Sequence, residues 1–589
     1  MFSFPFKEMR PGQKEIISQV IETVDSGSKL MINASTGLGK TVAVMLGALE
    51  ASKKAGKRIL VLTSKHTHQK IFYDTIKSIN LASNTNVKFV GVNGKQSMCL
   101  LDNDVDSSIF SEFCRVVREQ GACRFYSNTY SKDRSLKPSA LNALQFDVSN
   151  PSDCIENSRT FEVCPYEISM VYGKSADVVI ANYSHAFNED ISNSFFSKLN
   201  ISPKDTTLII DEAHNLHSKI QDINSTSISL RTLERAHEEI AKYGSAELAK
   251  KVKSIIESIK NVKGEEAVDF SDLFSAEDID AIDEIIEAGE SRSSIPPSFT
   301  LKRVVQLLLS SDESYLQYAS RENDRVRLNI YSLDPSGRAS EVISKFGSSI
   351  LMSGTFKPMD VFADLLGVQD ARKLDISDTF VDKNRLIIND TSVTSKFSHR
   401  DEQISTIAGN IRKLLSGVNG SSIIFFPSYD FMNKVAPLLG DLKSVVMEKQ
   451  KMTREEKESI LHRLKNKSSV LLSVIGGNFS ESIGIENNSV KLIVVVGVPF
   501  EPPSVRLKAL QNYYQAKFGR GFEYAQVLPS MIKAMQAAGR GIRSEKDRCT
   551  IILMDYRFSM FRKYLPSSTK FSNGNIVESI RSGALEDDR

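Results

Sequence analysis

The sequence predicts an α/β protein with two lobes, each built on a parallel β-sheet that helices cover. Helix-like and strand-like runs alternate through residues 1–85, as a parallel sheet requires. A glycine-rich loop at residues 34–41 joins a strand-like run to a helix-like run. A second set of apolar strand-like runs follows at residues 422–426, 470–473 and 492–496. The 589 residues are enough for roughly three or four domains.

The loop at residues 34–41 has the composition of a phosphate-binding site for a nucleoside triphosphate. Its glycines let the backbone direct several N–H groups at phosphate oxygens, and the following helix adds its positive dipole end. Lys40 would reach the outer phosphates and Thr41 would ligate Mg²⁺. Ala34 stands where many such loops carry their first glycine. The predicted ATP-binding residues here are Ser35, Thr36, Gly37, Leu38, Gly39, Lys40 and Thr41.

Two acidic residues, Asp211 and Glu212, narrow the function to nucleotide hydrolysis, whereas the loop alone is compatible with kinases, transporters and GTPases. They follow the apolar run at 208–210, which suits a Mg²⁺ site. Asp211 would hold the metal's shell and Glu212 would polarise the attacking water. The alternative is that both only cap the next helix. His214 is expected to connect this site to other motifs, unless it is a buried core histidine.

A basic helix far downstream supplies the third part of the nucleotide site. Arg540 and Arg543 are three residues apart and share a helical face. When such arginines face a γ-phosphate they neutralise transition-state charge, which is worth about 10³–10⁵ in rate. The alternative is a solvated basic face. Gln536 and Gly539 of the same segment are assigned to ATP binding.

The composition limits the possible partners. Charged residues make up 25% of the chain and hydrophobic residues 41%, and the net charge of +3 neither requires nor excludes nucleic acid. The N-terminus lacks the long apolar segment of a signal peptide, and the apolar stretch at 490–500 is too short to span a bilayer. We therefore expect an intracellular protein, cytoplasmic or nucleoid-associated, with no membrane partner.

Five of the six cysteines lie in one stretch of the chain. In a reducing cytosol, clustered cysteines more often bind metal or act in redox chemistry than form structural disulfides. Their irregular spacing fits neither a zinc ribbon nor a ferredoxin. The spacing therefore leaves both metal binding and simple packing open for Cys99, Cys114, Cys123, Cys154 and Cys164.

Together, the nucleotide motifs resemble those of superfamily 2 helicases, and other segments resemble the XPD branch of that superfamily. Gln13 follows Arg-Pro-Gly and matches a glutamine that reads adenine. Residues 353–355 (Ser-Gly-Thr) resemble the motif that couples ATP to nucleic acid, and residues 425–429 resemble the fourth motif. Residues 164–166 (Cys-Pro-Tyr) resemble the end of the XPD iron–sulfur domain. The resemblance covers nearly the whole chain.

The resemblance implies two RecA-like domains with ATP between them, and a small iron–sulfur (Fe-S) cluster domain and a helical arch domain inserted in the first. The expected boundaries are 1–85, 173–218 and 321–374 for the first RecA-like domain, 86–172 for the cluster domain, 219–320 for the arch and 375–589 for the second RecA-like domain. The resemblance also implies that a [4Fe–4S] cluster is held by Cys99, Cys114, Cys123 and Cys164. Cys154 is then spare, or replaces the fourth ligand, and zinc is the alternative metal.

DNA contacts are expected from basic and aromatic side chains. Basic groups follow phosphates, and aromatic rings stack on bases for roughly 1–3 kcal/mol each. Both kinds are interleaved at residues 115–137, where the rings could equally form the core of a small domain. At residues 480–484 the fifth helicase motif lacks the glycine and aspartate usual in the family. The expected DNA-binding residues are Lys65, Lys95, Arg115, Arg124, Tyr166 and Tyr429.

These observations predict an ATP-dependent DNA helicase that moves 5′→3′ on single strands. The polarity, a role in nucleotide excision repair and repair-protein partners come from the resemblance. The expected substrates are single-stranded DNA and fork or bubble DNA, and the expected state is a monomer. One alternative is a DinG-like helicase for R-loops or for replication and recombination intermediates. Another is an ATP-gated DNA-binding scaffold without processive translocation.

Overall fold

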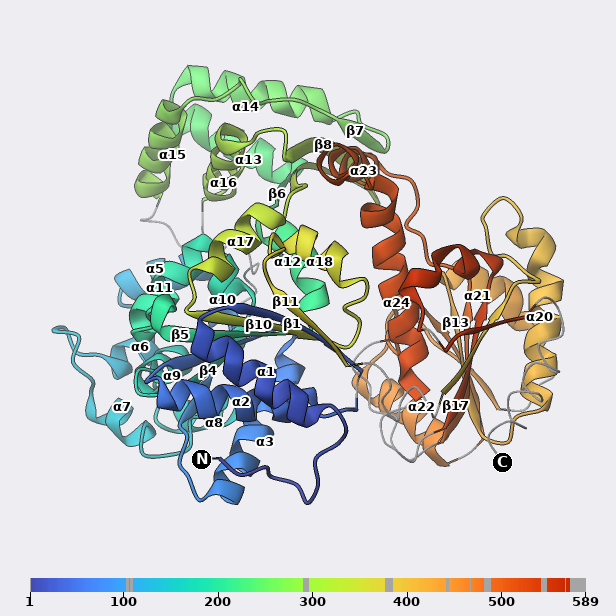
Figure 1. Cartoon of the computed structure of the whole chain (residues 1–589). Coiled ribbons are helices and arrows are strands. Elements are labelled where there is room, and N and C mark those ends of the chain that lie inside the picture. Colours follow the sequence, from blue (N-terminus) through green and yellow to red (C-terminus); the bar gives the residue numbers. More distant parts are fainter. Residues whose placement is uncertain are drawn as a thin grey trace.

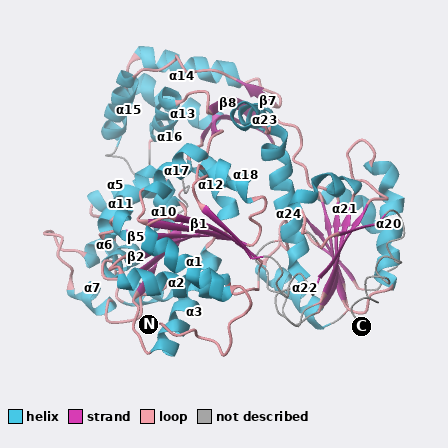
Figure 2. Ribbon diagram, viewed as in Figure 1, coloured by secondary structure: helices cyan, strands magenta, loops and turns pink. Residues whose placement is uncertain are grey.

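A computed structural model shows two parallel sheets side by side, with a third, smaller unit above the first (Figures 1 and 2). The structure describes residues 2–35, 37–101, 105, 110–289, 296–376, 385–440, 444–466, 468–480, 489–541, 548–566 and 568–572. Among these residues, no helix is both long and apolar enough to cross a bilayer.

The first sheet has the strand order β11-β1-β10-β5-β2-β4-β3, and all its pairings are parallel. Its strands are buried almost throughout, as expected when helices cover both faces of a parallel sheet. The strands are β1 (Lys29–Ala34), β2 (Arg58–Thr63), β3 (Phe89–Gly91), β4 (Val178–Asn182), β5 (Thr206–Asp211), β10 (Ser348–Ser353) and β11 (Arg372–Ile376). The helices are α1 (Gln13–Ser26), α2 (Lys40–Lys54), α3 (His66–Ser83), α10 (Ser184–Phe187), α11 (Glu189–Leu199), α12 (Leu216–Ile223), α17 (Ser336–Ser344) and α18 (Met359–Leu366).

The second sheet has the order β14-β15-β13-β16-β17-β12-β18 and is also parallel. The prediction of two RecA-like α/β domains is therefore confirmed. The strands are β12 (Arg385–Asp390), β13 (Ser421–Phe426), β14 (Val445–Met447), β15 (Val470–Val474), β16 (Val490–Val496), β17 (Cys549–Met554) and β18 (Lys570–Ser572). The helices are α20 (Arg400–Ser416), α21 (Tyr429–Val435), α22 (Arg454–Asn466), α23 (Val505–Phe518) and α24 (Leu528–Ala538).

The segment expected to be a helical arch contains a sheet as well as helices. Its helices are α13 (Leu230–Tyr243), α14 (Ala246–Ile259), α15 (Ala276–Gly289) and α16 (Ser298–Ser310). They pack on an antiparallel sheet of order β6-β9-β8-β7, formed by β6 (Thr226–Ser229), β7 (Glu265–Ala267), β8 (Tyr315–Glu322) and β9 (Arg325–Ser332). The long hairpin β8–β9 runs past the expected boundary at residue 320. Residues of β9 alternate between buried and more exposed positions. This alternation is a strand signal, which the helical periodicity upstream obscured in the sequence.

The cysteine-containing insertion consists of short helices that lead back into the first sheet at β4. Proline at the first turn of α8 and α9 suits helix starts, because the missing N–H has no intrahelical partner there. The helices are α4 (Lys95–Met98), α5 (Phe110–Glu119), α6 (Arg124–Thr129), α7 (Pro138–Ala143), α8 (Pro151–Thr160) and α9 (Pro165–Gly173).

Helices α23 and α24 join the two RecA-like halves (Figure 1). The upper end of α23 contacts β7 and β8 of the arch. Along the same helix, the Gln221 amide donates to the Tyr514 hydroxyl at 3.2 Å, and Lys517 Nζ donates to Asp334 at 2.6 Å. Helix α24 then runs down between the sheets, so one helical pair spans from the arch to the edge of the first sheet.

Candidate ATP site and cysteine-lined cavity

The nucleotide motifs meet at one edge of the first sheet because the carboxyl ends of parallel strands lie together. In the strand register, Asn33 at the end of β1 pairs with Ser353 at the end of β10. Met352 of β10 pairs with Asp211 at the end of β5. Three segments that are far apart in the sequence therefore converge: the phosphate loop, the acidic pair and the Ser-Gly-Thr segment.

The phosphate loop has the backbone conformation that its glycines allow. Gly37 and Gly39 adopt φ values of 90° and 83°, in the left-handed region that favours glycine. Lys40 begins α2, and its Nζ donates to the Ala34 carbonyl at 2.6 Å. Burial lowers the pKa of Lys40, while the nearby carboxylates of Glu212 and Asp211 act in the opposite direction. Thr36 lies outside the described residues.

Gln13 lies against the phosphate loop rather than in open space. Its amide donates to the carbonyls of Leu38 at 2.9 Å and Gly39 at 3.3 Å, and its carbonyl accepts from the Arg10 N–H at 2.7 Å. The side chain is 3% exposed. Gln13 thus braces the loop in this conformation.

Asp211 is buried and Glu212 is partly exposed, and the pKa values of the two carboxyl groups shift in opposite directions. Burial, followed by the charge of Glu212, raises the pKa of Asp211 to about 7. Burial also acts to raise the pKa of Glu212, but the hydrogen bond and charge of His214, together with the charge of Lys40, lower it to about 2. Glu212 is thus ionised at neutral pH, as a residue that polarises water must be. A cation beside Asp211 would favour its charged form.

Tyr183 supports the acidic pair and was not identified from the sequence. It follows β4 and is 1% exposed. Its hydroxyl donates to the backbone carbonyls of Asp211 and Glu212, the latter at 3.0 Å. Glu212 itself has a φ of 50°, an uncommon conformation for a non-glycine residue that often occurs at functional sites. The sequence signal that could have identified Tyr183 is its position at the end of the predicted strand at 177–183, which belongs to the same sheet as the strand that ends in Asp211.

His214 bridges the two RecA-like domains. Its Nδ1 lies 2.7 Å from Ser353 Oγ and 3.3 Å from Glu212 Oε2. Its Nε2 lies 2.7 Å from the amide nitrogen of Gln536, which belongs to α24 of the second domain. Ser353 Oγ in turn accepts from the Thr355 N–H at 3.0 Å. The predicted role of His214 as a connection between motifs is therefore confirmed.

The Gln536 contact brings the downstream segment that holds Gly539 and Arg540 to His214, which lies beside Glu212. Gly539 caps the C-terminus of α24, and Arg540 follows in the short turn Gly539–Gly541. Arg543 lies outside the described residues. Residues 481–488, which hold most of the altered fifth motif, lie outside them as well. Ser480 is buried, and its hydroxyl donates to the Gly477 carbonyl at 2.9 Å.

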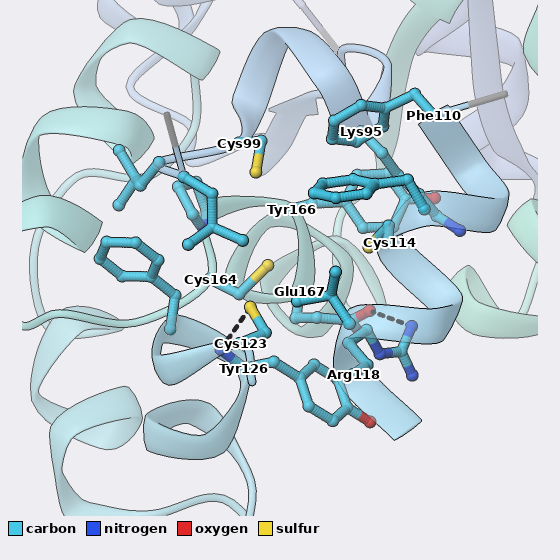
Figure 3. A pocket seen from close by; sticks show the side chains of 16 residues that line it. Lys95, Cys99, Phe110, Cys114, Arg118, Cys123, Tyr126, Cys164, Tyr166 and Glu167 are labelled. Carbon is cyan, nitrogen blue, oxygen red and sulfur yellow. Dashed lines mark hydrogen bonds and ion pairs between the residues drawn. The ribbon is translucent and has the colours of Figure 1, made fainter. Parts of the chain in front are cut away.

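Four cysteines line one cavity in the insertion (Figure 3). Cys99 follows α4, Cys114 lies in α5, Cys123 caps α6 and Cys164 precedes α9. Burial raises the pKa values of the Cys99, Cys114 and Cys164 thiols. In the described part of the chain, however, no group of three His, Cys, Asp or Glu side chains is arranged to hold a metal ion.

Cys154 is not on this cavity. It lies in α8, fully buried in a hydrophobic core that joins the insertion to the first sheet, and its sulfur donates to the Pro165 carbonyl at 3.3 Å. Burial raises the pKa of its thiol to about 12. The structure thus groups Cys99, Cys114, Cys123 and Cys164 and separates Cys154, which packs as a core residue.

Tyr166, one of the expected DNA contacts, is buried in the cysteine-containing insertion. Tyr166 is 7% exposed, and its ring has Lys95 Nζ at 5.7 Å and Lys198 Nζ at 5.2 Å from its centroid. Little of the ring is therefore available to a base in this conformation. Phe125 is similarly buried, so the interpretation of this ring as domain core is confirmed.

The remaining expected DNA contacts differ in their surroundings. Arg115 forms ion pairs with Glu112 and with Glu119, the latter at 2.9 Å. Arg124 lies 4.8 Å from the centroid of the Phe125 ring. Lys65 is exposed just before α3. Tyr429 begins α21, where its hydroxyl donates to a buried acid of its own domain rather than facing solvent.

The chain matches known helicase families over most of its length. The DEAD/DEAH box helicase family matches residues 10–108, DEAD_2 matches 63–233 and the helicase C-terminal domain matches 411–570. The ATP-dependent DNA helicase XPD of Sulfolobus acidocaldarius is 24% identical over 97% of this chain and 100% of its own length. The ATP-dependent DNA helicase chl1 of Aspergillus clavatus is 22% identical over 80% of this chain and 78% of its own length.

The fold gives the same result. A solved XPD helicase structure superposes with a TM-score of 0.69 at 22% identity, covering 96% of this chain and 100% of that one. The chain is thus similar, in sequence over almost its whole length and in fold, to helicases of the XPD type. Along the sequence, the insertion with the four grouped cysteines comes before the unit formed by α13–α16 and the antiparallel sheet β6–β9.

Proposed function

We propose that this XPD-like chain is an ATP-dependent DNA helicase that moves 5′→3′ on single-stranded DNA and unwinds duplexes, with nucleotide excision repair as its pathway. The observation that supports it most is the contact of His214 with Gln536, because it joins the second RecA-like domain to the segment of the first that carries Asp211 and Glu212. Clamps of this kind convert nucleotide binding and release into opening and closing motions.

The site residues suit in-line attack of water on a γ-phosphate. Lys40 neutralises the outer phosphates, and Arg540 and Arg543 neutralise the charge that develops in the transition state. Glu212, ionised at neutral pH, polarises the attacking water and accepts its proton. Thr41 and Asp211 would hold Mg²⁺, which supplies further charge neutralisation when bound. Ser35, Gly37, Leu38 and Gly39 offer backbone N–H groups to the phosphates.

Movement along DNA requires that the nucleotide site and the DNA track change together. His214 contacts the acidic pair, the Ser-Gly-Thr segment and α24, so a change at any of the three shifts its hydrogen bonds. In the proposed cycle, ATP hydrolysis loosens the contact between His214 and Gln536 and the two domains move apart. The second domain then binds the DNA single strand at a new position.

The cysteine-lined cavity suits a [4Fe–4S] cluster with a structural role. Four thiols from four separate segments face one space, which matches the ligand count of such a cluster and excludes Cys154. Cys99, Cys114, Cys123 and Cys164 would hold the cluster. A bound cluster would tie α4, α5, α6 and α9 to one another.

The proposed substrates are single-stranded DNA and fork or bubble DNA, and the proposed active unit is an intracellular monomer. The altered fifth motif at residues 480–484 favours a second candidate, an ATP-gated scaffold that opens bubbles without processive movement. A DinG-like role on R-loops is a third, which parallel assays on R-loops and on bubble duplexes would separate from repair.

The test is strand displacement on long duplexes with either a 5′ or a 3′ single-stranded tail. The proposal predicts ATP-dependent displacement of the 5′-tailed duplex only. Lys40→Ala should abolish ATPase and strand displacement, because it removes the ammonium group that neutralises the outer phosphates of ATP. Binding of single-stranded DNA should persist. Displacement from a 3′ tail would contradict the polarity. ATP-dependent bubble opening without displacement would favour the scaffold, and normal turnover by Lys40→Ala would contradict the site.

A further inference from the structure

Glu448 is a buried carboxylate of the second RecA-like domain that belongs to none of the nucleotide or DNA motifs. It directly follows β14 and is 3% exposed. Its two oxygens accept five hydrogen bonds from segments that are separate in the sequence. The donors are Tyr429 Oη at 2.8 Å, Ser473 Oγ at 2.5 Å, Val474 N at 3.2 Å, Asn478 N at 2.6 Å and Asn478 Nδ2 at 3.0 Å.

Burying a carboxylate costs free energy unless hydrogen-bond donors replace the water around it. The donors around Glu448 meet this requirement, and they connect separate segments of the second domain. All five donors are neutral groups, and together they satisfy both oxygens of the carboxylate. Burial and the hydrogen bond to Glu448 raise the pKa of Tyr429, so its hydroxyl keeps its proton and remains a donor. Glu448 therefore holds Tyr429 firmly to the end of β15 and to the loop after it.

The loop after β15 approaches Glu448 as closely as it does only because residue 477 is a glycine. A Cβ atom added to Gly477 would lie 2.4 Å from Glu448 Oε1 and 2.9 Å from the Val474 carbonyl. Both distances are below any normal contact. The chain thus combines a buried acid with a glycine that leaves room for it, and the same loop leads through Ser480 into the fifth motif.

We propose that Glu448 is a positioning residue that ties the fourth motif, through Tyr429, to the loop entering the fifth motif, so that both segments respond together when DNA binds. This inference rests on the proposed helicase function. It predicts that loss of the carboxylate uncouples DNA binding from ATP hydrolysis. The nucleotide site itself, which is built on Lys40, Asp211 and Glu212 of the other domain, keeps its basal rate.

Glu448→Gln is the first test, because the NH2 group of the new amide would face groups that donate hydrogen bonds to the carboxylate, and an amide NH2 group cannot accept these bonds. We expect basal ATPase within about twofold of the unaltered protein and a fall of about tenfold in the stimulation by an oligo-dT strand, as for loss of one buried hydrogen bond of about 1.4 kcal/mol. Gly477→Ala should reproduce the defect while keeping Glu448. Glu458→Gln is the matched control, since it removes only an exposed ion pair with Arg454 at 2.8 Å.

A double-mutant cycle separates positioning from general stability. If Glu448 acts through Tyr429, Tyr429→Phe should add little to the loss of stimulation in Glu448→Gln, because the two changes remove the same hydrogen bond. Equal losses of basal and DNA-stimulated ATPase, or full stimulation in a folded Glu448→Gln or Gly477→Ala protein, would overturn the inference. If Glu448→Gln does not fold, Gly477→Ala and Tyr429→Phe decide the question. If DNA does not stimulate the unaltered protein, the proposed function fails, and this inference fails with it.

Discussion

Replacing His214 with alanine tests whether the bridge between the domains transmits the presence of DNA to the nucleotide. The substitution removes two hydrogen bonds of 2.7 Å, one to Ser353 and one to Gln536. At about 1 kcal/mol each, their loss amounts to about 2 kcal/mol, or about 30-fold in a rate that depends on both. We therefore expect DNA-stimulated ATPase and strand displacement to fall about 30-fold, and basal ATPase to fall less.

The assay compares ATP hydrolysis with and without oligo-dT, together with displacement of a 5′-tailed duplex. Gln536→Ala removes only the contact between the domains and should cost about fivefold, half the free energy of the full loss. His462→Ala, an exposed histidine on α22, is the control. Wild-type stimulation in His214→Ala, or a proportional fall of basal and stimulated rates, would show that the bridge does not couple the domains.

Three further predictions concern other parts of the molecule. Cys99→Ser should remove the brown colour, the iron and the unwinding activity of anaerobically purified protein but leave some ATPase. Cys154→Ser should keep its iron. Loss of iron in both variants would contradict the separation of Cys154 from the four cavity cysteines. Burial lowers the pKa of His185 to about 4, so the unfolded state binds more protons than the folded state between pH 4 and 6.5. The free energy of unfolding should therefore fall as the pH drops through this window. His185→Phe should flatten this dependence on pH in denaturant unfolding curves, and an unchanged slope would refute the prediction. Gln13→Ala frees the Leu38 carbonyl and should raise the KM for ATP about tenfold, as for loss of one buried hydrogen bond; an unchanged KM would show that the brace is not needed.

Local patterns in the sequence were enough to predict the nucleotide chemistry and the class of fold. The phosphate loop, the acidic pair and the downstream arginines each have a short, fixed spacing, because their geometry is set within one loop or one helix turn. The same holds for the strands of both parallel sheets, whose continuous apolar runs reflect burial on both faces. The resemblance then separated the four cavity cysteines from Cys154, which their spacing alone did not.

Only the tertiary structure decided which distant side chains meet. The contact of His214 with Gln536, the support of Asp211 by Tyr183 and the five donors around Glu448 join residues that are remote in the chain, so no local pattern reports them. Burial is equally non-local, and it covers Tyr166, an expected DNA contact, with lysines from two separate segments. A sequence specifies the chemistry that each segment can offer, whereas packing of the segments determines which groups lose water and find partners.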